Sequence, residues 1–305
     1  MPMNATVERF LQYMRHERNL SERTVDRYRR DLEQWMAFAA PGGQEMDLPS
    51  VTANDVRAWL MNRAERGEKP ATLRVHLQAI RALFRYLMRK CVVKANPAMT
   101  VELAKLAKPL PSFVRESTVD AVLDADIDDQ DFTQVRDRLI VMLFYETGIR
   151  LSELIGLQDA AVDTAKRELK VRGKRDKDRI VPFGSELASA LDHYRSLRAE
   201  VRPECGNLLV TARGRALYPS LVYHVVHNAL LTAGGTGKLS PHVLRHTFAS
   251  VMLNSGAELN SVKELLGHES LAATQVYTHV TLSELQHNYE LAHPRALKKG
   301  GYYGS

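Results

Sequence analysis

Apolar side chains recur along the first hundred residues at the spacing of amphipathic helices. Val7, Phe10, Leu11 and Met14 follow one another at intervals that place side chains on one helical face. The same spacing predicts three further helices, with apolar faces of Tyr28, Leu32, Trp35 and Met36, of Val56, Trp59 and Leu60, and of Leu77, Ile80, Phe84 and Leu87. We therefore expect a small bundle of four helices.

Polar and proline residues mark where these helices begin. Ser21 or Thr24 can cap the second helix, and the third helix follows Thr52. Pro70 is a favourable first-turn residue for the fourth helix, and the Asn96–Pro97 pair ends the helical pattern.

A segment with two lysines and two prolines, residues 105–111, separates this bundle from the rest of the chain. We predict an N-terminal helical domain over residues 1–107, a linker over 108–112 and a second domain over 113–305. A chain of 305 residues is long enough to bury a core in each domain.

The second part of the chain mixes helical patterns with one hairpin. Residues 136–146 predict a strongly apolar helix that Gly148 can terminate. Two β-like runs, 168–171 and 179–182, are joined by the basic segment 173–177, and they predict a hairpin with a basic tip. Further helices extend to about Ala292. The expected fold class is mainly α, with a small antiparallel β-sheet in the second domain.

The positive charge is concentrated in the first third of the chain. Residues 1–108 hold 19 Lys and Arg against 12 Asp and Glu, whereas the remainder holds 23 against 24. A basic domain favours a polyanion such as DNA, although a solvated arginine-rich surface is an equally simple interpretation. The candidate DNA-facing residues of the second and fourth helices are Arg23, Arg27, Arg30, Arg74, Arg81 and Arg85.

Other bulk features narrow the classes of protein further. Apolar runs are too short for a membrane span, and the N-terminus lacks the layout of a signal peptide, so we expect a cytoplasmic location. Cys91 and Cys205 stand far apart, which favours reduced thiols without a metal. The acidic residues between 124 and 131 are most simply a solvated turn, with a metal site as the less favoured alternative.

Residues 241–280 hold the groups that phosphodiester chemistry requires. Cleavage needs a nucleophile, a means of stabilising charge on the phosphate and a proton for the leaving oxygen. Tyr277 can attack phosphorus, and the planar guanidinium of Arg245 can bind two phosphate oxygens at once. His242 precedes Arg245 by one helical turn, and His268 and Arg150 offer further positive groups.

Each of these residues also has an ordinary interpretation. An isolated arginine is usually part of a surface ion pair, His268 can cap a helix and Tyr277 can be a packed tyrosine. His242 and His246 have the i, i+4 spacing of a zinc pair, but Val243 occupies the position where a metalloprotease carries glutamate. A zinc-dependent hydrolase is therefore the rival enzyme class.

The segments 147–154 and 242–279 together resemble those of the tyrosine recombinases, the phage-integrase type of site-specific recombinase. The resemblance covers nearly the whole chain. It implies an N-terminal core-binding domain of the SAM-like kind, a C-terminal catalytic domain, and no metal, ATP or other cofactor.

The resemblance also implies a role for each matching residue. Arg150, His242 and Arg245 would stabilise the scissile phosphate with help from His268, and Glu153 would support them. Tyr277 would form a 3′-phosphotyrosyl bond with DNA. Lys174, at the hairpin tip, would protonate the departing 5′ oxygen. Arg175 follows Lys174 where family members usually carry glycine, so Lys177 is an alternative for that role.

Two short segments, 94–98 and 292–296, are most similar to the branch of the family that resolves chromosome dimers. That branch implies double-stranded recombination sites, a second related recombinase in a heterotetramer and a septal DNA translocase as regulator. An integrase of a mobile element or plasmid, or a catalytically silent DNA-binding relative, is the alternative. The apolar residues that follow Tyr277, namely Leu282, Leu285 and Leu291, suit either docking onto a neighbouring subunit or an intramolecular core.

Overall fold

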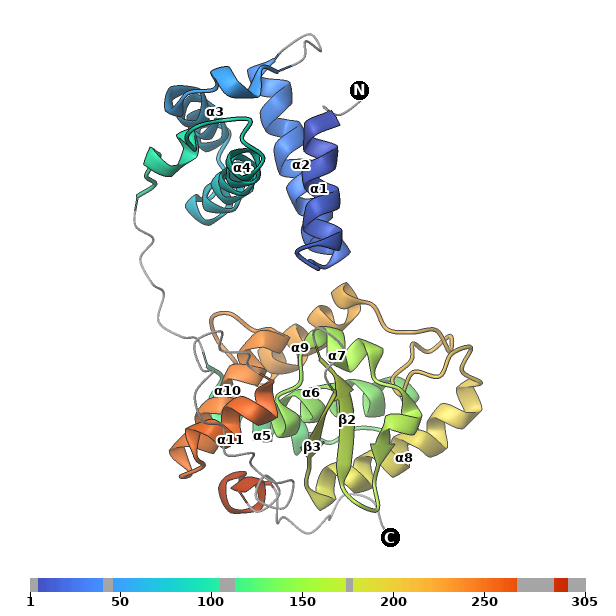
Figure 1. The fold of residues 1–305 in the computed structure, drawn as a ribbon. Coiled ribbons are helices and arrows are strands. Elements are labelled where there is room, and N and C mark those ends of the chain that lie inside the picture. Colours follow the sequence, from blue (N-terminus) through green and yellow to red (C-terminus); the bar gives the residue numbers. More distant parts are fainter. Residues whose placement is uncertain (1–4, 41–45, 105–112, 174–177, 268–287, 296–305) are drawn as a thin grey trace. The chain divides into compact units, whose positions relative to one another are not determined.

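The computed structural model describes residues 5–40, 46–104, 113–173, 178–267 and 288–295 (Figure 1). The chain divides into two compact units, residues 1–108 and 109–305. The predicted linker, 108–112, lies outside the described residues, so the boundaries of the two domains stay predictions. Each unit is described by itself below.

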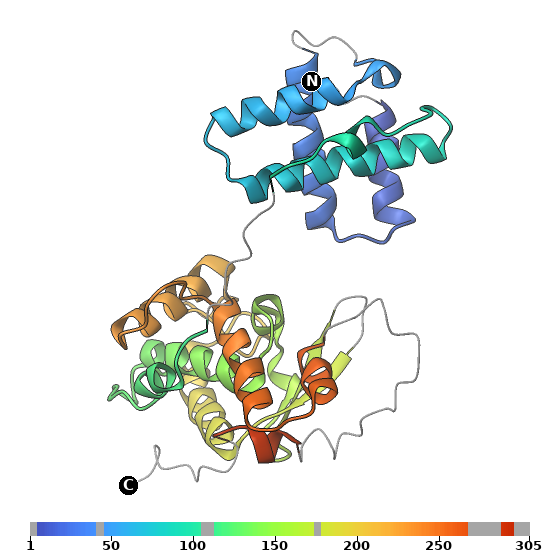
Figure 2. The ribbon, with the colours of Figure 1, turned by 90° about the vertical axis from the view of Figure 1, so that its left-hand side faces the viewer.

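The first unit contains the four expected helices. They are α1 (Ala5–His16), α2 (Glu22–Ala39), α3 (Ala53–Glu65) and α4 (Pro70–Arg89), with the short 3-10 helices η1 (Leu48–Ser50) and η2 (Pro97–Thr100). Figure 2 shows two helical hairpins, α1–α2 and α3–α4, that cross one another. The predicted apolar faces meet in one core, in which Trp35 and Trp59 are fully buried. Helical periodicity alone therefore predicted this unit correctly.

The starts of the helices follow the expected capping chemistry in part. The Thr52 side chain accepts a hydrogen bond from the Asp55 backbone N–H, and the Asp55 carboxylate accepts one from the Thr52 N–H. Pro70 occupies the first turn of α4, as predicted. Ser21 is the N-cap residue of α2, but its hydroxyl pairs with that of Thr24 at 2.9 Å rather than with a backbone N–H.

Two of the arginines expected to face DNA bind the unit's own backbone instead. Arg81 donates to the carbonyls of Ala98 and Val101, at 2.9 and 2.8 Å. Arg74 donates to the carbonyls of Leu103 and Ala104. These bonds hold the segment after α4 against the bundle, so the candidate DNA surface is smaller than the sequence predicts.

A buried histidine links two acidic side chains in the first unit. His76 Nδ1 lies 3.1 Å from Asp31 Oδ1, and its Nε2 lies 2.8 Å from Glu68 Oε2. Glu68 also binds Arg63, and the His76 ring packs against Trp59. The hydrogen bond with Asp31, opposed by burial, raises the pKa of His76 above 6.5.

This network predicts that the first unit loses stability as the pH rises. The protonated imidazole stabilises the fold fully below about pH 6.5, and that contribution disappears as the pH passes the raised pKa. We expect the loss between about pH 6 and pH 9 to be about 2 kcal/mol, the size of a hydrogen bond to a charged group. Urea titrations of the full chain, followed by tryptophan fluorescence, measure it, because both tryptophans lie in this unit. The His76→Gln variant should show a much weaker pH dependence; an equal dependence would contradict the assignment.

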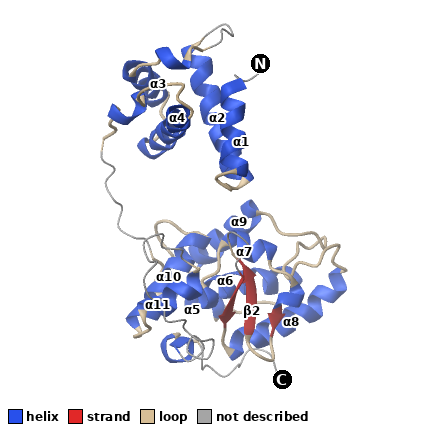
Figure 3. Ribbon diagram, viewed as in Figure 1, coloured by secondary structure: helices blue, strands red, loops and turns tan. Residues whose placement is uncertain are grey.

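The second unit is mostly helical and carries one small sheet. Its helices are α5 (Glu116–Leu123), α6 (Phe132–Thr147), α7 (Leu151–Gly156), η3 (Asp159–Ala161), α8 (Ser185–Val201), α9 (Pro219–Thr232), α10 (Pro241–Asn254) and α11 (Leu259–Leu266). The strands are β1 (Val162–Asp163), β2 (Glu168–Arg172) and β3 (Asp178–Pro182). They form an antiparallel sheet in the order β1-β2-β3 (Figure 3). The predicted hairpin is confirmed as β2 and β3, and β1 is an addition that the sequence did not predict.

Helix α6 is the centre of this unit, and α8, α9 and α10 pack around it. Asp131 caps its start by accepting the N–H groups of Thr133 and Gln134. Gly148 ends it with a φ of +58°, as the sequence predicts. A Cβ atom at Gly148 would lie 2.9 Å from Leu266 and even closer to Phe248. The glycine thus lets α10 and α11 approach the end of α6, two residues before Arg150.

The last described residues, 288–295, pack on this unit. Arg295 is buried and pairs with Asp120, Asp124 and Glu186, so the acidic stretch is partly an ion-pair partner rather than only a solvated turn. Tyr289 is buried whereas Leu291 is exposed; Leu282 and Leu285 lie outside the described residues. No described helix combines the length and the apolar character needed to cross a membrane.

Candidate active site and DNA interface

Three arginines from separate elements meet at the C-terminal end of α11. Arg179 in β3 donates its Nε–H to the carbonyl of Leu265 at 2.7 Å. Arg245 in α10 donates to the carbonyl of Leu266, and Arg150 at the start of α7 donates to that of Gly267, both at 2.6 Å. The last carbonyls of a helix lack partners within the helix, so these guanidinium groups satisfy three consecutive acceptors.

A single carboxylate organises two of the three arginines. Glu153 accepts the backbone N–H of Arg150 at 2.8 Å and its Nη1–H at 2.6 Å. Arg179 binds both carboxylate oxygens, at 2.9 and 2.8 Å. Burial opposes ionisation of Glu153, but the hydrogen bonds from Arg179 and Arg150 outweigh it and lower its pKa to about 2. Glu153 is therefore ionised at any physiological pH.

Glycine is favoured where α11 ends against these arginines. Gly267 has a φ of +63°, a conformation that side chains rarely adopt. A Cβ atom there would lie 3.0 Å from Nη1 of Arg179 and 3.4 Å from Nη1 of Arg150. A side chain at residue 267 would therefore crowd the Arg179 guanidinium in addition to straining the backbone, and glycine avoids both.

The cluster carries more positive than negative charge. Burial, together with the nearby charge of Arg150, lowers the pKa of Arg245 to about 10, so its guanidinium stays protonated at neutral pH. Each guanidinium has five N–H donors, and the bonds of Arg150 and Arg245 described above use only some of them. Three cations around one carboxylate suit a bound anion such as a phosphodiester.

The structure shows His242 and Arg245 one turn apart on α10, with different exposure. Arg245 is buried, whereas His242 is exposed. The His242 ring lies 6.5 Å from that of Tyr223. Partial burial and the charges of Lys238, His246 and Arg245 lower its pKa, so the imidazole is neutral at physiological pH.

The zinc alternative gains no further ligand from the described residues. His246 is exposed like His242. Within the described ranges, no three His, Cys, Asp or Glu side chains are grouped as metal ligands.

Three of the six predicted site residues lie outside the described residues. They are Lys174, His268 and Tyr277, together with the alternative Lys177. Lys174 follows Gly173, the first residue after β2, and His268 follows Gly267. The structure therefore brings Arg150 and Arg245 together. Of Lys174 and His268, it places only the preceding residues, Gly173 and Gly267.

Sequence reasoning missed Arg179. It was assigned only to a β-like run, because a strand arginine beside a basic hairpin tip looks like any exposed cation. A usable signal was its place directly before the apolar residues Ile180–Pro182, because a charge in an apolar strand needs a partner if its side chain is buried.

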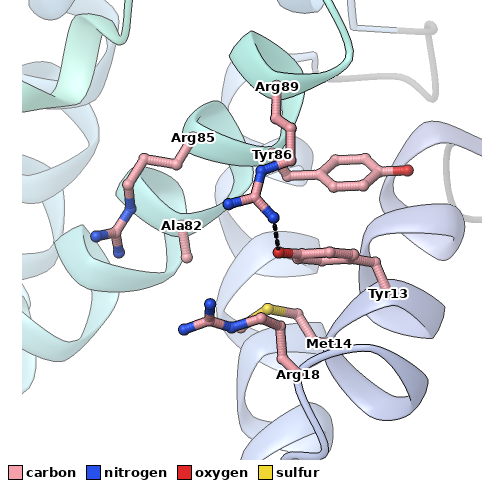
Figure 4. Close-up of a pocket in the computed structure, with 7 residues that line it drawn as sticks. All are labelled: Tyr13, Met14, Arg18, Ala82, Arg85, Tyr86 and Arg89. Atoms are coloured by element: carbon pink, nitrogen blue, oxygen red, sulfur yellow. Dashed lines mark hydrogen bonds between the residues drawn. The ribbon is translucent and has the colours of Figure 1, made fainter.

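The first unit has a hollow of about 210 Å³ between α1 and α4 (Figure 4). The guanidinium groups of Arg18, Arg85 and Arg89 gather on one side of its two tyrosine rings. Arg89 donates a hydrogen bond to the Tyr13 hydroxyl and lies 5.6 Å from the ring centroid. All three arginines are exposed, which makes this cationic hollow the best candidate for a DNA contact in the unit.

Models of known protein families match both units of the chain. Residues 112–284 match the model of the phage integrase family, and residues 7–91 match that of the phage integrase N-terminal SAM-like domain. The chain belongs to the phage integrase family. It is accordingly a site-specific tyrosine recombinase, an enzyme that breaks and rejoins DNA.

Curated relatives extend over nearly the full chain of this recombinase. A protein of Chlorobaculum tepidum named tyrosine recombinase XerC is 37% identical over 314 residues, covering 94% of each chain. The protein of the same name from Pseudomonas aeruginosa is 36% identical over 302 residues, covering 99% of each. Both relatives are thus similar to this chain over nearly its whole length.

Solved structures share the fold at lower identity. XerH site-specific recombinase bound to its difH substrate, in a pre-cleavage complex, matches with a TM-score of 0.66 at 21% identity, covering 93% of this chain and 82% of that one. A lambda integrase dimer bound to a COC′ core site matches with a TM-score of 0.64 at 16% identity, covering 91% and 100%. The expected fold class is thereby confirmed.

Proposed function

We propose that this recombinase resolves chromosome dimers at cell division, as a XerC-like enzyme. It acts on a double-stranded, dif-like recombination site. Its partner is a XerD-like recombinase, with which it forms a heterotetramer on two DNA sites, and a septal DNA translocase regulates it. Support comes from the curated relatives named XerC, which match at 36–37% identity across both domains.

One observation carries the assignment of the active site. Arg150 and Arg245 are far apart in the sequence, yet both donate to the end of α11. The next residue along the chain is His268, and Tyr277 follows nine residues later. Arg150 and Arg245 are thus gathered at one place, and the segment of the sequence that carries His268 and Tyr277 continues from it.

The reaction is a transesterification at phosphorus. The Tyr277 hydroxyl loses its proton to water as its oxygen attacks the scissile phosphorus, the bond to the 5′ oxygen breaks, and a 3′-phosphotyrosyl linkage forms. Lys174 supplies the proton that the departing 5′ oxygen takes up. A 5′ hydroxyl of another strand then attacks the linkage and releases Tyr277, so the energy of the original bond is conserved and no ATP is needed.

The arginine cluster stabilises the charge that develops on the phosphate. Arg150 and Arg245 are held by backbone carbonyls and by Glu153, so their orientation is set before DNA binds. Such preorganised donors lower a barrier because they need no rearrangement during the reaction. Neutral His242 donates a hydrogen bond to the same phosphate, and His268 assists.

The cationic hollow of the first unit contacts the DNA backbone. Its exposed arginines can neutralise phosphates and release counterions, and this makes the affinity fall as salt rises. Phosphate contacts position the enzyme on the duplex, whereas base contacts determine which site it selects.

Cleavage of defined DNA sites tests the proposed function. The purified recombinase, with a XerD-like partner from the same genome, is incubated with labelled duplexes carrying a dif-like site or a scrambled site. We expect a covalent adduct on a denaturing gel with the first duplex alone, and an equal yield in excess chelator. Adduct formation only at sites from a mobile element would assign the integrase role instead. Cleavage that chelator abolishes would favour the zinc hydrolase.

A further inference from the structure

We propose that Arg179 is a positioning residue for the cleavage reaction, linking the β2–β3 hairpin to Arg150 and to the end of α11. The inference rests on the proposed function, because it concerns the site in which Arg150 binds the scissile phosphate. Arg179 does not itself bind DNA; it acts through Glu153 and through the backbone of α11.

The two arginines that bind Glu153 differ in how far their side chains are buried, and this indicates different roles. The exposed fraction of the side chain is 26% for Arg150, 12% for Arg179 and 3% for Glu153. Arg150 thus keeps surface for a phosphate, whereas Arg179 is turned inward and binds both carboxylate oxygens. A nearly buried carboxylate needs such a partner to remain charged.

An ionised Glu153 fixes Arg150. Its carboxylate accepts both the backbone N–H and the Nη1–H of Arg150, so it sets the start of α7 and the direction of the guanidinium. Without Arg179, burial favours the protonated acid, which is a weaker acceptor. Arg150 would then lose the orientation that it needs for the phosphate.

Arg179 also connects the segments that lead to the other proposed site residues. It is the second residue of β3, which begins directly after residues 174–177 and therefore after Lys174. Its Nε–H binds the carbonyl of Leu265, and its guanidinium lies against Gly267, the residue before His268. One side chain thus joins three separate segments of the site.

Single-turnover cleavage of a suicide substrate, a nicked dif-like duplex that traps the covalent adduct, tests the proposal. We expect Arg179→Gln to slow adduct formation about a hundredfold, the effect typical of a misplaced catalytic group, with unchanged affinity for DNA. Arg179→Lys should be intermediate, because it keeps the charge but lacks the planar fork. The melting temperature of each variant is measured alongside.

Two readouts distinguish positioning from a purely structural role. In Arg179→Gln the ratio of variant to wild-type rate should fall as the pH is lowered from about 8 to about 5, because Glu153 becomes protonated. In a Glu153→Gln background, Arg179→Gln should slow cleavage little further. The ratio of the double-variant rate to the Glu153→Gln rate should be independent of pH. A pH-independent ratio with fully additive effects would overturn the proposal.

Arg195 provides a matched control in the same unit. It pairs with Asp159 and donates to the carbonyls of Asp159 and Val162, so it resembles Arg179 in its bonding. Arg195→Gln should lower the melting temperature without altering the rate or its pH profile.

If Arg179→Gln does not fold, the same comparison is made with Arg179→Lys, and a wild-type rate in that variant overturns the proposal. A wild-type enzyme that forms no adduct at any site refutes the proposed function itself.

Discussion

Replacing Tyr277 with phenylalanine is expected to abolish the covalent adduct while leaving DNA binding intact. The substitution removes only the hydroxyl oxygen that is proposed to attack phosphorus. Incubation with a suicide substrate, followed by a denaturing gel, should show adduct for the wild type and none for Tyr277→Phe. A mobility-shift assay should give the same affinity for both proteins.

Tyr218→Phe is the matched control, since Tyr218 is 53% exposed in the same unit and has no proposed role. It should form adduct at the wild-type rate. Adduct that persists in Tyr277→Phe would show that another residue is the nucleophile. Loss of adduct together with loss of DNA binding would show that Tyr277 is needed for the fold or the interface rather than for the chemistry.

The second large effect is expected for Arg245. Arg245→Lys keeps a positive charge but removes the guanidinium fork. That fork binds the carbonyls of Gly148 and Leu266 and still has N–H donors for a phosphate. Loss of one fixed donor to developing charge costs about 3–4 kcal/mol, so we expect cleavage to slow by about 10²–10³. Single-turnover rates at saturating DNA measure the effect, and the DNA affinity should change far less.

Arg245 is buried, so its replacement also destabilises the second unit. The melting temperature is therefore measured with the rate, and rates are compared below the onset of unfolding. Arg213→Lys, at an exposed position of the same unit, should leave both unchanged. A folded Arg245→Lys protein that cleaves at the wild-type rate would contradict the proposed role of Arg245.

Much of the fold follows from local patterns in the sequence. The spacing of Val7, Phe10 and Leu11 is sufficient to predict α1, because a helix buries one face whatever it packs against. Gly148 ends α6 because only glycine readily adopts its backbone conformation. Strand β1 escaped prediction because it is two residues long and exists only through its pairing with β2.

The family and the proposed set of site residues also come from the sequence, because the order of Arg150, His242, Arg245, His268 and Tyr277 is a linear signature. The roles of these residues stay predictions, and His268 and Tyr277 lie outside the described residues. The exposure of His242 could not be read from its spacing to Arg245, since residues three apart differ by a sixth of a turn and the boundary of the core falls between them.

The sequence by itself determined the helices, the family and the candidate chemistry, since each depends on residue type and spacing along one segment. Only the tertiary structure decided that Arg74 and Arg81 bind their own backbone, and that Arg179 shares Glu153 with Arg150. These are contacts between residues distant in the chain. They depend on which carbonyl or carboxylate the folded backbone brings within hydrogen-bonding distance, and no local pattern specifies that.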